Sequence, residues 1–90
     1  MRIVFVDDDN QVLEGLRRML FGRRDVWTMR FISDPNAALA ALAEEPAELV
    51  VSDLQMPVMD GAAFLEQVRS RFPETIRYVL TGVLDHPLLG

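Results

Sequence analysis

The sequence predicts one small α/β domain built on a doubly wound parallel sheet. Short runs of β-branched and aliphatic residues, such as 3–6 and 49–51, are typical of strands buried on both faces of a sheet. These runs alternate with segments whose apolar residues recur at helical spacing. Half of the 90 residues are apolar, which is enough for a single core. Alternating strands and helices joined by right-handed crossovers place helices on both faces of the sheet.

The first strand and helix are separated by an acidic turn. The apolar run 3–6 predicts a strand, and leucines at helical spacing predict a helix over 10–21. Asp9 or Asn10 can cap that helix, because short polar side chains accept hydrogen bonds from the first-turn amides. Gly22 is a natural residue just past its end.

The second pair of elements has a clear boundary. Residues 27–32 alternate in polarity, as expected of a strand. Asp34 then stands where an N-cap is expected, with Pro35 at the first helical position. The segment 37–45 is rich in alanine and leucine, which favour a helix, and Pro46 ends it.

The second half repeats the alternation. A third strand is predicted over 49–52, and Asp60 with the following glycine opens a helix through about residue 72. Residues 76–80 predict a fourth strand. The segment 81–90 is predicted as a loop that enters another helix.

Composition excludes several classes of function. The net charge of −5 argues against nucleic-acid binding, which needs a basic face. The absence of cysteine excludes disulfides and thiolate metal sites. No apolar stretch reaches the roughly 20 residues of a membrane span, and there is no signal-peptide pattern. We therefore expect a soluble cytoplasmic protein.

Three acids follow two of the predicted strands. Asp7 and Asp8 come directly after the first strand, and Asp53 comes directly after the third. Ligand sites of parallel sheets lie beyond the carboxyl ends of the strands. If the two strands are neighbours, the three carboxylates meet and repel one another unless a cation or a proton intervenes. Oxygen ligands suit a hard cation such as Mg2+, so the pattern predicts a metal-assisted phosphate site.

Other polar residues near this edge have simpler interpretations. Asp9 and Asp60 are predicted as helix N-caps rather than as further acids of the site. Thr81 follows the fourth strand and places a hydroxyl at the same edge, with the small Gly82 beside it. His86, the only histidine, is interpreted as a solvated or helix-capping residue rather than a phosphoryl carrier.

From Arg2 to about Thr81 the sequence resembles the receiver domain of two-component response regulators. The resemblance rests on the order strand, paired Asp, strand, Asp, and then Met-Pro-x-Met-Asp-Gly over 56–61. It implies that Asp53 accepts a phosphoryl group from a histidine kinase.

The same resemblance implies further roles at the site. Asp8 would bind Mg2+ directly, and Asp7 would hold it partly through water. Asp53 and the backbone carbonyl of Gln55 would be additional ligands. Thr81 would be the switch hydroxyl that moves toward the phosphoryl oxygens.

The resemblance also implies a flavodoxin-like receiver fold with strand order 2-1-3-4-5. Receiver domains carry a Lys at the end of the fifth strand, whereas all nine basic residues here are arginine. We therefore expect four strands in the order 2-1-3-4, and residues 1–90 to form a receiver domain that lacks its C-terminal portion. The fourth strand would be an exposed edge, which predicts a homodimer paired through it.

Three functions compete. The leading prediction is a phosphorylation-dependent switch with a histidine kinase as partner and an output domain in a longer parent protein. Such a switch is not an enzyme, beyond catalysing its own phosphorylation and dephosphorylation. The alternative is a phosphorylation-independent interaction module, which the absence of Lys favours. A phosphatase with an Asp nucleophile is disfavoured, because Gln55 stands where such an enzyme needs a general acid two residues beyond the nucleophile.

Overall fold

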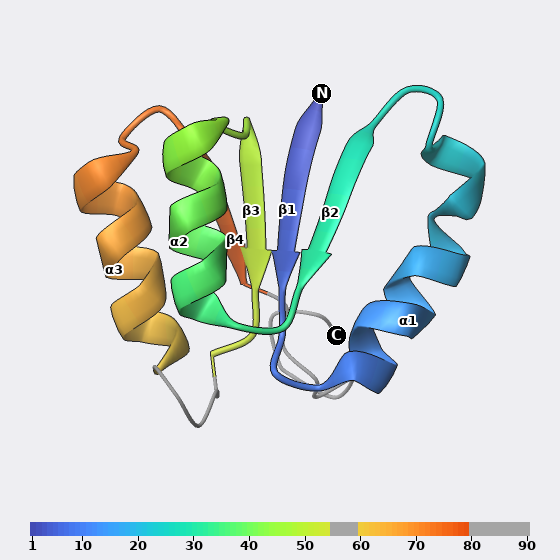
Figure 1. Cartoon of the computed structure of the whole chain (residues 1–90), viewed down its shortest axis with the longest axis horizontal. Helices are drawn as coiled ribbons and strands as arrows, with labels where there is room; N and C mark the ends of the chain where they lie inside the picture. Colours follow the sequence, from blue (N-terminus) through green and yellow to red (C-terminus); the bar gives the residue numbers. More distant parts are fainter. Residues whose placement is uncertain (55–59, 80–90) are drawn as a thin grey trace, which may run out of the picture.

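In the computed structural model of the chain, residues 1–54 and 60–79 are described. They form a parallel sheet of four strands in the order β2-β1-β3-β4 (Figure 1), which confirms the predicted fold class and strand order. No helix in this described part is both long and apolar enough to cross a membrane. The elements are β1 (Arg2–Val6), α1 (Asn10–Met19), the 3-10 turn η1 (Phe21–Arg23), β2 (Thr28–Ile32), α2 (Pro35–Glu44), β3 (Leu49–Ser52), α3 (Gly61–Arg71) and β4 (Ile76–Val79).

The register of the sheet decides which residues meet at its carboxyl edge. The central strand β1 pairs with β2 on one side and with β3 on the other. Val6, the last residue of β1, lies opposite Ile32 in β2 and Ser52 in β3. Asp7 and Asp53 therefore leave the sheet at the same level on neighbouring strands.

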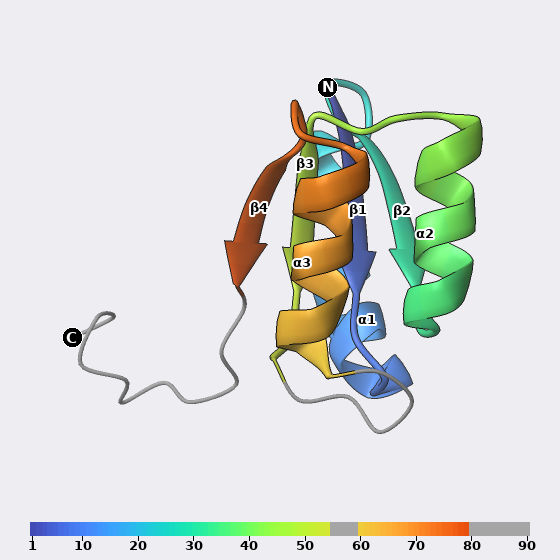
Figure 2. The same ribbon diagram turned by 90° about the vertical axis from the view of Figure 1, so that its left-hand side faces the viewer.

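Helices cover both faces of the sheet, as predicted. Figures 1 and 2 show α2 and α3 on one face and α1 on the other. Alternate residues of β1 divide between the faces, because successive side chains of a strand point in opposite directions. One core contains Val4, Val6, Ala38, Leu39, Leu42, Ala47, Val50, Phe64, Leu65 and Val68. The other contains Ile3, Phe5 and Leu13, with partly buried Leu16, Leu20, Trp27, Met29, Phe31, Leu49 and Val51 against them.

Three aspartates begin the three α-helices. The carboxylates of Asp9, Asp34 and Asp60 each accept a hydrogen bond from the backbone amide two residues further on, at 2.9, 3.0 and 2.9 Å. Each cap satisfies an amide that has no partner within its helix. The predicted caps are confirmed, with Asp9 rather than Asn10 in that position for α1.

The end of α1 differs from the prediction. The helix stops at Met19, and Gly22 lies within η1 without a positive φ, so it is not a left-handed C-cap. The amide of Arg23 instead donates to the carbonyl of Leu20 at 2.8 Å. The chain tightens into a 3-10 turn after α1, and this turn gives hydrogen-bond partners to carbonyl groups at the end of the helix without a left-handed residue.

The remaining described bounds agree with the prediction or differ from it by one residue. The third strand spans Leu49–Ser52 and α2 begins at Pro35, both as predicted. The second strand begins at Thr28 instead of residue 27, and α2 ends at Glu44 instead of residue 45. The last residue of the predicted fourth strand and the predicted loop and helix over 81–90 lie outside the described residues.

A buried hydroxyl joins two turns at the amino edge of the sheet. Thr75 precedes β4, and its Oγ1 donates a hydrogen bond to the backbone carbonyl of Ala47 at 2.7 Å. The following amide, of Ile76, donates to the carbonyl of Glu48 at 2.9 Å. These bonds hold the start of β4 against the start of β3.

Candidate functional site

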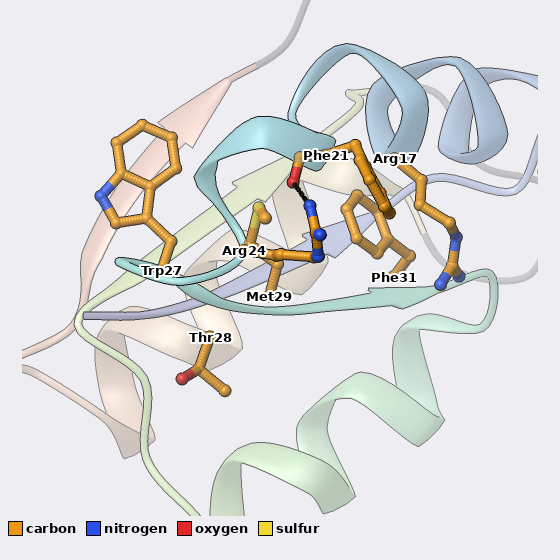
Figure 3. A pocket seen from close by; sticks show the side chains of 7 residues that line it. All are labelled: Arg17, Phe21, Arg24, Trp27, Thr28, Met29 and Phe31. Carbon is orange, nitrogen blue, oxygen red and sulfur yellow. Dashed lines mark hydrogen bonds between the residues drawn. The ribbon is translucent and has the colours of Figure 1, made fainter.

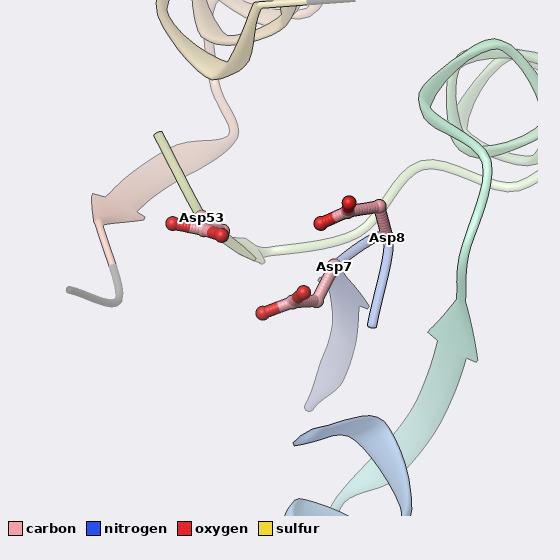
Figure 4. Close-up of side chains that lie close together, drawn as sticks. All are labelled: Asp7, Asp8 and Asp53. Atoms are coloured by element: carbon pink, nitrogen blue, oxygen red, sulfur yellow. The ribbon is translucent and has the colours of Figure 1, made fainter. Parts of the chain in front are cut away.

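The three predicted acids meet at the carboxyl edge of the sheet. Asp7 and Asp8 follow β1, Asp53 follows β3, and the three carboxylates point to the same side of the edge (Figure 4). One carboxylate oxygen from each lies within 4.8 Å of one from each of the others. The juxtaposition expected from the strand order is therefore present, and it makes a compact cluster of anionic oxygens.

Backbone hydrogen bonds beyond the strand ends fix where these side chains start. The amide of Asp53 donates to the carbonyl of Val6 at 3.2 Å, and the amide of Asp7 donates to the carbonyl of Ile32 at 3.3 Å. The ladder thus continues one residue past each strand. Because both acids are still held by the sheet, their positions are set by the core rather than by free loops.

The three acids differ in their exposure to solvent. Only 5% of Asp7 is exposed, Asp53 is half-buried and Asp8 is exposed. Burial is the main cause that raises the pKa of the Asp7 carboxyl above its ordinary value. The amide of Asp9, which donates to Asp7 Oδ1 at 2.9 Å, opposes this rise, whereas the charges of Asp53 and Asp8 add to it.

The cluster fits a small divalent cation. Two oxygens bound to one Mg2+ at about 2.1 Å lie about 3.0 to 4.2 Å apart, since its coordination is octahedral. Carboxylate oxygens within 4.8 Å of one another are close to this spacing, so small rotations of the side chains suffice. In the described part of the chain neither Asp7 nor Asp8 forms an ion pair with an arginine. A cation would offset the repulsion and favour the ionised form of Asp7.

Gly61 lets the start of α3 approach the site closely. Its amide donates to the carbonyl of Leu54 at 2.9 Å. A Cβ atom at position 61 would lie 2.1 Å from the carbonyl oxygen of Asp53 and 2.4 Å from the Cα of Leu54. Only glycine fits there without movement of either the start of α3 or the backbone that carries Asp53. From the sequence, this glycine is predicted only as the opening of a helix; the Asp-Gly pair is the signal that marks the position.

Two predicted site residues cannot be placed. Gln55 and Thr81 both lie outside the described residues, as do positions 56–59 of the Met-Pro segment. The carbonyl ligand and the switch hydroxyl therefore stay predictions.

Comparison with known families agrees with the fold and the acidic edge. Residues 3–89 match the family model described as the response regulator receiver domain. A doubly wound four-stranded sheet with an acid cluster beyond β1 and β3 is thus a receiver fold with its acidic pocket. The chain belongs to the response regulator receiver domain family.

Individual relatives show the same relationship. The chain is 35% identical over 83 residues to the hydrogenase transcriptional regulatory protein HoxA of Cupriavidus necator, covering 92% of the chain and 17% of HoxA. It is 36% identical over 80 residues to the DNA-binding transcriptional regulator NtrC of Salmonella typhimurium, covering 89% of the chain and 17% of NtrC. The chain thus spans under a fifth of each of these two relatives.

Solved structures give the same picture. The signal receiver domain of an HD domain-containing protein from Pseudomonas fluorescens Pf-5 superposes with a TM-score of 0.83 at 32% identity, covering 98% of this chain and 68% of that one. RcsB from Salmonella enterica serovar Typhimurium, bound to the rprA promoter in the presence of the phosphomimetic BeF3-, gives a TM-score of 0.78 at 27% identity, covering 90% of this chain and 42% of that one.

Proposed function

We propose that this chain is a phospho-acceptor signalling switch in which Asp53 receives a phosphoryl group from a histidine kinase. The observation that carries the proposal is the approach of Asp7, Asp8 and Asp53 carboxylate oxygens to within 4.8 Å of one another at the carboxyl edge of a receiver fold. In the transfer, an oxygen of Asp53 attacks phosphorus, the P–N bond to the donor histidine breaks, and the imidazole leaves. The phosphoryl group then resides on Asp53 as an acyl phosphate.

The positions of the acids suit different roles. Asp53 is half-buried at the end of β3, so its carboxylate is held by the sheet but can still be reached by a donor. Asp8 would bind Mg2+ directly, Asp7 partly through water, and the carbonyl of Gln55 would complete the protein ligands. When bound, Mg2+ neutralises charge on the acids and on the transferred phosphoryl oxygens. Thr81 would turn its hydroxyl toward the phosphorylated Asp53 and pass the change to neighbouring surfaces.

The partners of the whole protein belong to the same proposal. HoxA and NtrC are transcriptional regulators, and another relative, from Pseudomonas savastanoi pv. phaseolicola, is a protein-glutamate methylesterase. These relatives support an output domain in a longer parent protein. The net charge of −5 supports a receiver domain that itself makes no direct contact with nucleic acid. The RcsB structure obtained with BeF3- supports phosphorylation as the input. We place the protein in the cytoplasm and assign it no catalytic turnover beyond its own phosphorylation and dephosphorylation.

Phosphoryl uptake tests this proposal directly. The parent chain and Asp53→Asn are incubated with acetyl phosphate, with and without MgCl2, and their intact masses are measured. We expect one phosphoryl group on the parent chain only, and only with MgCl2. Uptake by Asp53→Asn equal to that of the parent would overturn the assignment of Asp53.

One alternative function is a receiver that acts as a protein-interaction module without phosphorylation. Binding of Mg2+ separates the two functions. A module of this kind has no need of the cation, and a chain that binds neither Mg2+ nor a phosphoryl group would support it.

We also propose that two copies pair through β4. This strand is the last in the described sheet, and 64% of Ile76 and 65% of Tyr78 are exposed. An apolar edge strand offers unpaired backbone groups to a second chain. Size-exclusion chromatography with circular dichroism should show a folded dimer that dissociates on dilution, and a dilute monomer that stays fully folded would refute this pairing.

A further inference from the structure

A second polar and aromatic surface lies on the β2 flank of the domain. A hollow of about 380 Å3 is lined by the end of α1, by η1 and by β2. None of the three acids of the cluster lines this hollow. The two sites are therefore separate. The residues that line the hollow are Arg17, Phe21, Arg24, Trp27, Thr28, Met29 and Phe31 (Figure 3).

The arginines of this surface are held by aromatic rings. The guanidinium of Arg24 lies 3.7 Å from the centroid of the Phe21 ring and donates to the Phe21 carbonyl at 2.8 Å. The Arg17 guanidinium lies 4.8 Å from the centroid of Phe31, which in turn stacks on Phe5 at 4.9 Å. Figure 3 shows the guanidinium of Arg24 next to Phe21, with the hydrogen bond to the Phe21 carbonyl drawn as a dashed line. Stacked guanidinium groups keep edge N–H donors available for an anionic partner.

The charge of this region is opposite to that of the chain as a whole. Residues 17–31 hold five arginines and one acid, a formal charge of +4, in a chain of net charge −5. The rest of the sequence holds four arginines against thirteen acids. Among the described residues Arg17 pairs with Glu14 at 3.1 Å, but neither Arg23 nor Arg24 forms an ion pair. Arg17 and Arg24 line the hollow and Arg23 lies over the Trp27 ring, whereas Arg18 lines a separate hollow on α1 and Arg30 alternates to the other face of the sheet. The positive charge of this surface thus comes from Arg17, Arg23 and Arg24.

Exposed apolar side chains extend the surface beyond the hollow. The exposed fractions are 76% for Met19, 61% for Val26 and 57% for Phe21. Large aromatic side chains and arginines together are the composition of protein-binding hot spots. An area that extends past the hollow suits a polypeptide better than a small anion.

We propose that this α1–η1–β2 surface binds an acidic segment of a partner protein, with an apolar side chain of the partner in the hollow. Acidic residues of that segment would lie on Arg23 and Arg24, since opposite charges are complementary there. This site is independent of the phosphorylation proposed for Asp53.

Trp27, the only tryptophan, lines the hollow and reports on its occupancy. The protein is titrated with a short synthetic peptide in which Asp and Glu flank one Leu, and Trp27 emission is recorded. Two control peptides carry Lys in place of the acids or Ala in place of the Leu. We expect a saturable change with the acidic Leu peptide only, and weaker binding as NaCl is raised.

A matched pair of charge reversals locates the binding site. Arg24→Glu and Arg71→Glu change the net charge equally, and both arginines lie over a phenylalanine ring, at 3.7 and 5.5 Å. We expect Arg24→Glu to weaken peptide binding about tenfold and Arg71→Glu to leave it nearly unchanged. Circular dichroism verifies folding, and the salt series on the unmodified protein tests the proposal without any variant.

Several results would overturn this inference. They are equal effects of the two charge reversals, equal binding of the Lys peptide, or no change of Trp27 emission with the acidic Leu peptide. A response to inorganic phosphate or adenosine monophosphate without one to the peptides would assign the hollow to a small anion instead.

Discussion

The contact between α3 and the backbone of Asp53 makes Gly61→Ala an informative change. A Cβ at this position would lie 2.1 Å from the Asp53 carbonyl oxygen and 2.6 Å from the Leu54 carbonyl carbon. Both obstacles are backbone atoms, so no rotation of a side chain can relieve the conflict. Either the start of α3 or the segment that carries Asp53 must move.

The required movement can be worked out from the distances. Cβ contacts below 3.0 Å are essentially never found, so the Asp53 oxygen and the new Cβ must separate by at least 0.9 Å, the difference from 2.1 Å. Overpacking of this kind destabilises a domain by about 1 to 3 kcal/mol. A displacement of about 1 Å in a reacting group can slow a reaction by about a hundredfold. We therefore expect Gly61→Ala to lose stability and to slow phosphoryl uptake by Asp53.

Gly15→Ala is the matched control. Gly15 lies within α1, and a Cβ there meets nothing within 4 Å. The same substitution should stabilise the domain by about 0.5 to 1 kcal/mol, because alanine loses less backbone entropy in a helix. Urea unfolding followed by circular dichroism measures both variants, and acetyl phosphate labelling gives the rates. A Gly61→Ala variant as stable and as reactive as the parent would refute the close approach of α3.

Three further predictions concern the acid cluster, the buried hydroxyl of Thr75 and the core around Phe64. Because the pKa of Asp7 is raised in the folded state, the folded chain holds its proton more strongly than the unfolded chain does. Stability without metal should therefore fall as pH rises from the ordinary value of 3.8 through the raised pKa. Asp7→Asn should remove this fall in stability, stabilise the metal-free protein at neutral pH and abolish the stabilisation by Mg2+. Urea unfolding at several pH values, with and without MgCl2, would measure these effects. A metal-free variant that is less stable than the parent at neutral pH would contradict the prediction. Thr75→Val leaves the carbonyl of Ala47 without its 2.7 Å donor, so thermal unfolding should show a loss of about 1 to 3 kcal/mol, and an unchanged melting temperature would mean that this bond adds nothing. Phe64, on α3, is fully buried in the core that α2 and α3 form with the sheet. Phe64→Ala should remove about 3 to 5 kcal/mol, a large part of the stability of a domain this small. Urea unfolding with a loss below about 1 kcal/mol would contradict this packing.

Much of the fold could be predicted because local signals agreed with one another. The aspartates that cap the helices, the proline at the start of α2 and the apolar run of β3 each mark a boundary through local chemistry. The acid cluster could be predicted because it depends only on two strands being neighbours and ending at the same level. The strand order 2-1-3-4 came from the family resemblance, not from periodicity.

Other features depend on packing that no local pattern encodes. The 3-10 turn after α1 replaces the expected left-handed glycine, because the Leu20 carbonyl finds its donor in Arg23. The burial of Asp7, with Asp8 exposed beside it, depends on the folded surroundings of the sheet edge and not on the residue types, which are identical. The need for glycine at position 61 arises from a contact with Leu54, seven residues earlier, that only the folded chain makes.

Locating the phosphoryl group on the chain tests the central claim most directly. After reaction with acetyl phosphate and MgCl2, the acyl phosphate is reduced with borohydride, which converts the modified aspartate to homoserine, and peptides are sequenced by tandem mass spectrometry. We predict homoserine at position 53 alone, and none when MgCl2 is omitted or when Asp8 is changed to Asn. Homoserine at Asp7 or Asp8, or equal labelling of Asp53 without a divalent cation, would contradict the assignment of Asp53 as acceptor and of its neighbours as the acids that hold the metal.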